Sequence, residues 1–251
     1  MNNERFSHHE PCPRCHSRDN LGVWDDGHKF CFGCGWRVPS PASIANLKKK
    51  ASMVENNNKN GNVASVDSDS FTYVIPPLAV KWLRKYGITD NEIIHYGILW
   101  NARTDSLVFA IRDEHGIILT NERYFGTNPN HPKYITQGNK TTNTCYFINK
   151  NTPKSLVLVE DFISAIKVAR FANCLPLLGS QIPSNALKWA VERFKCLRVW
   201  LDMDKAVESL QQASRASQWV SNTRSIITEL DPKEYGNNNL IMILKQYGVL
   251  A

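Results

Sequence analysis

The last hundred residues alternate between short apolar runs and segments with a helical pattern. The apolar runs predict four strands, at Leu156–Val159, Cys174–Leu178, Leu197–Leu201 and Ser225–Thr228. The segments between and after them predict four helices, at Phe162–Phe171, Asn185–Phe194, Lys205–Val220 and Asn239–Tyr247. Apolar runs of this length between helices are typical of strands that are buried on both faces, as in parallel sheets. The pattern therefore predicts an α/β fold, a parallel sheet with helices on both faces.

A different pattern precedes this sheet. Two helices are expected, at Pro77–Gly87, which a glycine closes, and at Thr89–Tyr96, which Thr89 caps. Alternating segments then predict three mostly antiparallel strands, at Ser106–Arg112, Ile117–Tyr124 and Lys133–Thr136, with residues 113–116 as a hairpin turn. We expect a small mixed α+β subdomain in front of the parallel sheet.

Residues 39–70 have few large apolar side chains and include a run rich in asparagine, which is typical of a flexible linker. The linker gives the expected domain organisation of the chain. Residues 1–38 would form a cysteine-rich module, residues 71–152 the mixed subdomain, and residues 153–251 the parallel-sheet subdomain.

Carboxylates follow two of the predicted parallel strands. Glu160 comes directly after the first strand, and Asp202 and Asp204 come after the third. The carboxyl ends of strands are where open α/β sheets bind ligands, and side chains two residues apart on an extended chain share a face. Carboxylate oxygens are ligands for hard cations, so the sequence predicts a catalytic magnesium site at this edge.

Three further residues stand at the same expected edge. Asp231 offers one more carboxylate there or only begins a turn, and Asp161 is equally well explained as the cap of the next helix. Gly179 follows the second strand, where the missing side chain would let the backbone approach a metal or a phosphate.

Two CxxC pairs near the amino terminus predict a second metal site. Cys12 and Cys15 are followed after fifteen residues by Cys31 and Cys34, and four thiolates complete a tetrahedral shell, so this site would hold one structural zinc ion. Two disulfides or a redox-active CxxC pair are the alternatives. The chain shows no secretory signal and has an odd number of cysteines, 7, so we expect a reducing, cytoplasmic location instead.

A formal net charge of +7 on a chain with an acidic predicted site favours a polyanionic partner such as nucleic acid. Arg123, Lys133 and Lys140 in the mixed subdomain could hold triphosphates or a template backbone, or could simply be exposed charges. No run approaches the roughly 18 apolar residues of a membrane span, so no membrane partner is expected.

Glu160, Gly179 and the Asp202, Asp204 pair, each after a predicted strand, resemble the TOPRIM motifs of primases, topoisomerases and some nucleases. With the four-cysteine module, which ends in the sequence CFGCGW, and the mixed subdomain, the chain is similar to the primase half of phage primase-helicase proteins. The resemblance covers nearly all of the chain except the linker. One departure is that Asp161 and Ser164 stand where the family's first motif has a glycine and an aspartate.

The resemblance implies a DNA primase, which would synthesise short RNA primers from ribonucleoside triphosphates on a single-stranded DNA template. Glu160, Asp202, Asp204 and Asp231 would hold magnesium, with Glu160 as proton acceptor or only as a ligand. Arg123 and Lys140 would grip nucleotide and template. The sequence has no G-x-x-x-x-G-K-[ST] phosphate loop, so we expect a separate replicative helicase as partner, in the host cytoplasm if a phage encodes the chain.

Two other functions stay open at this point. A TOPRIM nuclease would use the same carboxylates to cleave DNA, but it would not require the cysteine module or the basic subdomain. A recombination mediator would bind DNA without catalysis and would tolerate loss of the carboxylates. A topoisomerase is excluded, because 251 residues leave no room for a strand-passage domain.

Overall fold

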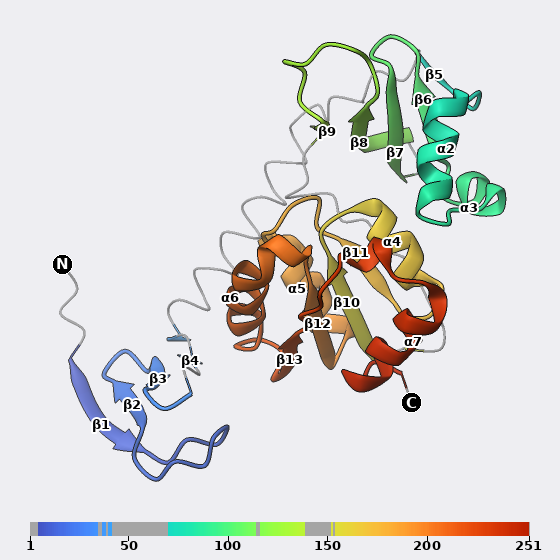
Figure 1. Ribbon diagram of the computed structural model, residues 1–251. Helices are drawn as coiled ribbons and strands as arrows, with labels where there is room; N and C mark the ends of the chain where they lie inside the picture. Colours follow the sequence, from blue (N-terminus) through green and yellow to red (C-terminus); the bar gives the residue numbers. More distant parts are fainter. Residues whose placement is uncertain are drawn as a thin grey trace.

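The described chain has three parts, each built on its own sheet (Figure 1). The computed structural model describes residues 5–34, 37–38, 40–41, 70–113, 116–138, 152 and 154–250. The predicted linker lies almost entirely outside these residues. No helix in the described ranges is both long and apolar enough to cross a membrane.

The carboxyl-terminal part, here called the parallel-sheet subdomain, has the predicted α/β fold. Its parallel strands are ordered β11-β10-β12-β13, with β10 at Ser155–Val159, β11 at Cys174–Pro176, β12 at Cys196–Trp200 and β13 at Asn222–Ser225. The helices are α4 at Phe162–Ala169, α5 at Ser184–Arg193, α6 at Ala206–Ala216 and α7 at Asn237–Gln246. Two 3₁₀ turns, η1 at Met203–Lys205 and η2 at Pro232–Glu234, follow β12 and β13.

Helices cover both faces of this sheet, as predicted. Along β10, Leu156 and Leu158 belong to the core formed with α5 and α6. Val157 and Val159 belong to the opposite core, formed with α4 and α7. Because both faces of the strand are buried, its sequence is an unbroken apolar run instead of an alternating one.

Two predicted elements differ from the structure by three or more residues at one end or both. The last strand runs from Asn222 to Ser225, three residues before the predicted Ser225–Thr228. It pairs only with β12 and lies at the edge of the sheet, so it alternates one buried residue, Thr223, with exposed polar ones and lacks the apolar run of a central strand. Helix α6 is also shorter than predicted, because it ends at Ala216 instead of Val220 and its first predicted residue, Lys205, belongs to η1.

The mixed subdomain contains helices α2 at Pro77–Lys85 and α3 at Asp90–His95, both close to prediction. Its antiparallel sheet has β5 at Phe71–Thr72, β6 at Leu99–Asn101, β7 at Ser106–Asp113, β8 at Gly116–Tyr124 and β9 at Tyr134–Gly138. The short strands β5 and β6 were not predicted. Phe162, Ile163 and Ile166 of α4 complete its core, so α4 joins this sheet to the parallel one.

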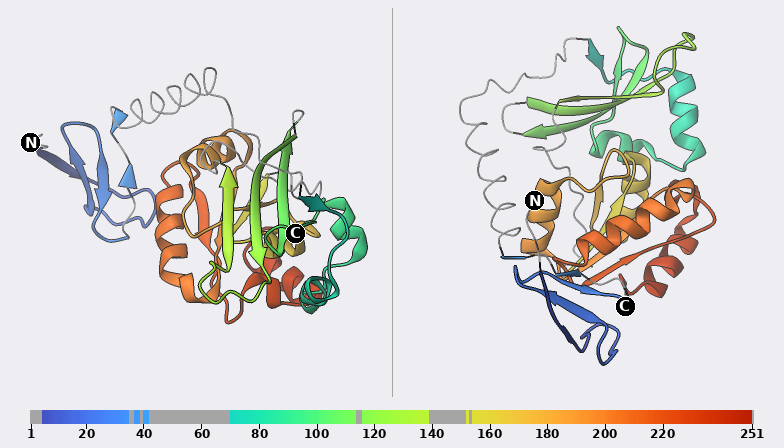
Figure 2. Two further views of the ribbon diagram at one scale, coloured as in Figure 1. Left: turned by 90° about the horizontal axis from the view of Figure 1, so that it is seen from above. Right: turned by 90° about the vertical axis from the view of Figure 1, so that its left-hand side faces the viewer.

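The amino-terminal part, here called the cysteine ribbon, is an antiparallel sheet of four short strands. These are β1 at Phe6–Glu10, β2 at Leu21–Trp24, β3 at Lys29–Cys31 and β4 at Arg37–Val38. Among its described residues, Cys12, Leu21 and Cys31 form a small buried cluster, and Val23 is buried as well. The ribbon lies near α6 and β13 (Figures 1 and 2), and Arg14 Nη1 donates a hydrogen bond to Ser217 Oγ at 3.4 Å.

Candidate active site

Acidic side chains gather at the carboxyl edge of the parallel sheet. Val159 of β10 pairs with Trp200 of β12, so Glu160 and Asp202 leave neighbouring strands at the same edge. Asp161 follows Glu160 and caps α4, where its Oδ1 accepts the backbone N–H of Ser164 at 2.8 Å. The sequence therefore placed these acids correctly relative to the strands, and the capping role of Asp161 is confirmed.

Asp231 caps the short η2 turn at the same edge. Its carboxylate accepts the backbone N–H of Met203 at 2.9 Å, which ties the loop after β13 to the loop after β12. Burial alone would raise the pKa of Asp231, but the hydrogen bonds from Met203 and from the Lys233 ammonium outweigh it and lower that pKa. Asp231 therefore begins a turn, as predicted, and its carboxylate also lies in the acidic group, while its role as a metal ligand stays a prediction.

A lysine that the sequence analysis missed lies among these acids. Lys233 Nζ is 2.9 Å from Asp161 Oδ2, 2.5 Å from Asp202 Oδ2 and 3.0 Å from Asp231 Oδ2. Burial would lower the pKa of Lys233, but the carboxylates of Asp161 and Asp202 outweigh burial and raise it. Its place two residues after Asp231, in the loop that follows the last strand, was the signal that could have found it.

Two carboxylate oxygens of this group are buried and have no hydrogen-bond partner, Glu160 Oε2 and Asp202 Oδ1. Burial, together with the charge of Asp161, raises the pKa of Asp202 to about 7. Burial also raises the pKa of Glu160, with the charges of Asp161 and Asp204 adding to it. Buried anionic oxygens without donors are costly unless a cation binds them, so these two residues fit a magnesium ion.

Asp204 lies apart from this pair. Its side chain is 70% exposed, and its Oδ2 is 3.5 Å from Lys205 Nζ. Within the described ranges, only the four cysteines place three or more potential ligand atoms within 4.8 Å of one another. The ligand atoms of Glu160, Asp202 and Asp204 are therefore not all within 4.8 Å of one another, since η1 turns the chain between Asp202 and Asp204, although the charge of Asp204 still acts on Glu160.

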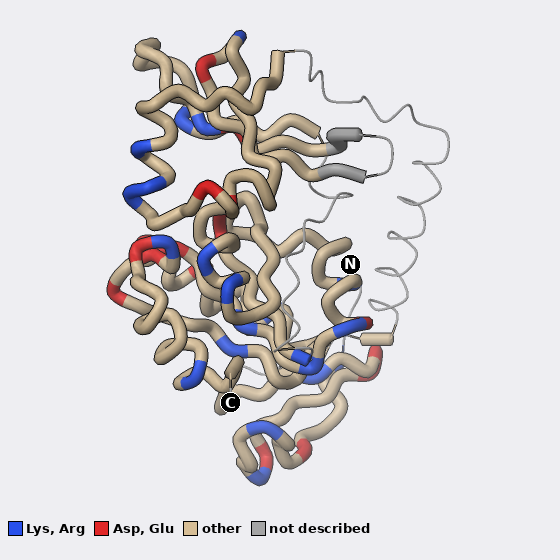
Figure 3. Tube along the Cα trace, turned by 90° about the vertical axis from the view of Figure 1, so that its right-hand side faces the viewer, with Lys and Arg blue, Asp and Glu red and all other residues tan. Residues whose placement is uncertain are grey.

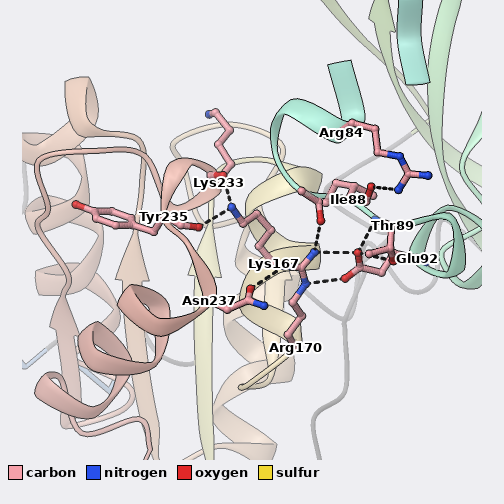
Figure 4. A network of polar contacts seen from close by, with 10 residues as sticks. Arg84, Ile88, Thr89, Glu92, Lys167, Arg170, Lys233, Tyr235 and Asn237 are labelled. Atoms are coloured by element: carbon pink, nitrogen blue, oxygen red, sulfur yellow. Dashed lines mark hydrogen bonds and ion pairs between the residues drawn. The ribbon is translucent and has the colours of Figure 1, made fainter. Parts of the chain in front are cut away.

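A buried lysine supports the loop that carries Lys233. Lys167 Nζ on α4 donates hydrogen bonds to the backbone oxygens of Lys233 and Tyr235, each at 2.6 Å (Figure 4). One turn further, Arg170 binds Glu92 of α3 through two hydrogen bonds, at 2.7 and 2.8 Å, and donates to Asn237 of α7 at 2.7 Å. Helix α4 thus fixes both the acidic edge and the mixed subdomain.

The expected basic residues lie in different surroundings. The Arg123 guanidinium packs against the rings of Trp82 and Phe125, 4.5 and 4.3 Å from their centroids, so aromatic contacts fix its position. Lys133 is exposed, 5.9 Å from the ring of Tyr134. Lys140 lies outside the described residues. Lys and Arg positions occur in all three parts of the described chain (Figure 3).

Gly179 lies beside the acidic edge, as expected from its place after β11. Its backbone N–H donates to Glu160 O at 3.3 Å, and its φ of 145° is one that side chains disfavour. The residue therefore brings a backbone segment against the first strand of the site.

The four predicted zinc ligands form one cluster. Cys12 Sγ is 3.8 Å from Cys34 Sγ, and Cys15 Sγ is 3.6 Å from Cys31 Sγ. Thiolates around a tetrahedral zinc ion lie about 3.8 Å apart, since each Zn–S bond is about 2.3 Å. Hydrogen bonds from Ser17 lower the pKa of Cys15 to about 6, which favours the thiolate form that binds metal. The cluster can hold a metal ion such as zinc.

Aromatic rings cover one surface of the cysteine ribbon. Trp24 stacks on His28 with centroids 4.4 Å apart, and Phe30 meets Phe32 edge to face at 5.0 Å. Phe32 is 60% exposed. These rings line a cavity of about 370 Å³ together with Lys29, Val38 and Gln218, the last of which follows α6. Trp36 lies outside the described residues.

The chain is similar in sequence to a phage replication protein. It is 24% identical to the DNA helicase/primase of Enterobacteria phage T3 over 229 residues, which is 85% of this chain and 38% of that protein. No family model matches the chain. The resemblance that the sequence motifs indicated is confirmed by this match, although the chain spans only 38% of the length of this relative.

Two solved primase structures have a similar fold. The DnaG catalytic core superposes with a TM-score of 0.53 at 15% identity, over 68% of this chain and 73% of that one. The zinc-binding and RNA polymerase domains of the Aquifex aeolicus primase give a TM-score of 0.52 at 12% identity, over 98% and 79%. The predicted fold class is therefore confirmed.

Proposed function

We propose that this chain is a DNA primase, a nucleotidyltransferase that synthesises short RNA primers on single-stranded DNA. The observation that carries the proposal is its sequence similarity to a phage helicase/primase across 85% of the chain. The pair of buried, unpartnered oxygens on Glu160 and Asp202 supports it, since metal-dependent nucleotidyl transfer needs such ligands.

Glu160 and Asp202 would hold catalytic magnesium, with Asp231 and the exposed Asp204 as further carboxylates on the same edge. Bound magnesium would lower the pKa of the attacking 3′-hydroxyl and stabilise negative charge on the departing pyrophosphate. The primer O3′ would bond to the α-phosphorus of the incoming triphosphate as the bond to the β-phosphate oxygen breaks. Glu160, whose pKa burial raises, is the candidate acceptor for the hydroxyl proton.

Cations of the mixed subdomain would hold the phosphates. Arg123 suits this role because the rings of Trp82 and Phe125 fix its guanidinium, so little entropy is lost when a phosphate binds. Exposed Lys133 would contact the template backbone, and Lys140 the triphosphate. Gly179 would let its backbone segment approach the bound nucleotide.

The cysteine ribbon would hold one structural zinc ion and read the template. Trp24, Phe30 and Phe32 give stacking faces next to Lys29, a combination suited to single-stranded DNA. The domain organisation proposed from the sequence, with residues 39–70 as a linker between ribbon and catalytic part, suits a reader that is tethered to the catalytic site.

A replicative helicase is the expected partner. The phage T3 relative is named for both helicase and primase. The 251 residues of this chain contain no phosphate-loop motif, so helicase activity would come from outside them. The chain would act in the cytoplasm, where the template, the ribonucleotides and the helicase are present. If a phage encodes the chain, this is the cytoplasm of the host.

A primer-synthesis assay tests the proposal directly. The purified chain is incubated with single-stranded DNA, magnesium and labelled ribonucleotides, and we expect short RNA products that Asp202→Asn abolishes. Glu192→Gln is a matched control, because it removes one carboxylate charge from a side chain on α5 that is 56% exposed. Shortened DNA would indicate a nuclease instead, and DNA binding without any chemistry would indicate a mediator.

A further inference from the structure

Lys233 brings a fixed positive charge into the proposed magnesium site. We propose that its ammonium group permanently takes the place of one cation, so that the carboxylate edge binds a single divalent ion beside it. This inference rests on the proposed function only in assuming that Glu160 and Asp202 bind a divalent cation. Two-metal sites hold their ions about 3.5–4 Å apart. In this chain the ammonium group of Lys233 would occupy one of the two ion positions.

The contacts of the ammonium are complete. A lysine ammonium has three N–H donors, and Lys233 Nζ lies within 3.0 Å of three carboxylate oxygens, one each on Asp161, Asp202 and Asp231. The three aspartates come from the loops after β10, β12 and β13. A single side chain thus neutralises charge on three segments at once, as a metal ion does.

The two oxygens of Asp202 are used differently. Oδ2 accepts from Lys233, whereas Oδ1 is buried and has no partner, like Oε2 of Glu160. Asp202 can therefore serve as a bridge, with the ammonium on one oxygen and a metal ion on the other. In a two-metal site a shared carboxylate would carry an ion on each oxygen.

The position of Lys233 is fixed on both sides. Its side chain is only 16% exposed, and its backbone oxygen accepts a hydrogen bond from the buried Lys167 at 2.6 Å. If the ammonium swung out to admit a second ion, three aspartates would lose their shared partner. Lys205 shows the contrast, because it is 37% exposed and its Nζ lies 3.5 Å from an exposed carboxylate, that of Asp204.

Counting bound Mn²⁺ by electron paramagnetic resonance tests the inference. The measurement uses the zinc-loaded chain of 251 residues. We expect this chain to bind one Mn²⁺ ion that the Asp202→Asn variant does not bind. Lys233→Met keeps the length of the side chain but removes the charge, so it should add a second ion or tighten the first by at least tenfold. Lys233→Arg keeps the charge and should leave one ion. Lys245→Met, which removes an exposed charge from α7, should leave both values unchanged.

Two Mn²⁺ ions in the parental chain would overturn the inference, whether or not Lys233→Met folds. A Lys233→Met variant that is folded by circular dichroism but has parental ion count and affinity would overturn it as well. These outcomes differ from a failure of the proposed function. A chain that makes primers with two ions keeps the function and loses this role of Lys233, whereas a chain that binds one ion and makes no RNA loses only the function.

Discussion

The two candidate metal sites differ in what surrounds them. The four cysteines lie within 23 residues of sequence, and two of them are themselves part of a core of three buried residues. The carboxylates lie on a sheet with a large core on each face, and their loops follow three different strands. We therefore expect that the cysteine ribbon would need a bound ion in order to fold, whereas the sheet that carries the carboxylates would fold without one.

The largest expected effect concerns the carboxylate edge. Glu160→Gln and Asp202→Asn should each lower primer synthesis by on the order of 1,000-fold or more, because each removes a charged ligand from the reaction centre. The fold should remain, since both sheet cores are intact. Single-turnover primer assays and thermal unfolding check the two parts of this prediction. Near-parental rates in either variant would refute the assignment of the site.

The next effect concerns the cysteine ribbon. Here the substitution should unfold part of the chain but leave part of the activity. Cys31→Ser should release zinc and unfold the ribbon alone, because the ribbon otherwise has only a small buried cluster among its described residues. A measurement of zinc content would show the loss of the ion. Limited proteolysis would show a cleaved ribbon and an intact remainder. The variant should still extend a supplied dinucleotide but lose initiation at preferred template sites. Equal loss of both activities would contradict this division of roles.

The sequence predicted the ribbon site more completely than the carboxylate site, for a physical reason. Two CxxC pairs encode all four ligands locally, so their spacing alone defines the cluster. The apolar runs before Glu160 and Asp202 also predicted the strands that carry them. Lys233 was missed because its three partners are distant in sequence, and contacts between distant segments leave no periodic pattern. The separation of Asp204 was missed because a short 3₁₀ turn interrupts the extended chain that the spacing argument assumed.

A smaller effect is expected from a cation beyond the described residues. If Lys140 grips the triphosphate, Lys140→Ala should weaken nucleotide use by on the order of 100-fold, since a charge-assisted contact in the transition state is lost. Lys133→Ala is the comparison, because Lys133 is exposed and would contact only the template backbone. It should reduce the salt slope of DNA binding by nearly one unit, whereas Lys140→Ala should leave that slope unchanged. If Lys140→Ala changes neither nucleotide use nor the slope, the residue does not belong to the site.

The smallest effect is a pH dependence that only the carboxylate edge should show. Burial and the charge of Asp161 raise the pKa of Asp202 to about 7 in the folded chain, whereas an unfolded aspartate titrates near 3.9. Between these values the folded chain binds a proton that the unfolded chain lacks, so the free energy of unfolding should fall as pH rises toward 7. Without divalent cations but with zinc bound, the contribution of Asp202 between pH 5.5 and 7 is about 2 kcal/mol.

Asp202→Asn isolates this contribution, because the substitution removes the titrating group and leaves the other ionisable groups of the chain in place. The difference in free energy of unfolding between Asp202→Asn and the parental chain should grow in favour of the variant as pH rises, and magnesium should reduce that difference by stabilising the ionised carboxylate of the parental chain. Chemical denaturation of the parallel-sheet subdomain at several pH values measures both. A difference independent of pH would mean that Lys233 compensates the charge of Asp202 completely, which would leave no unpaired charge on that side chain for an ion.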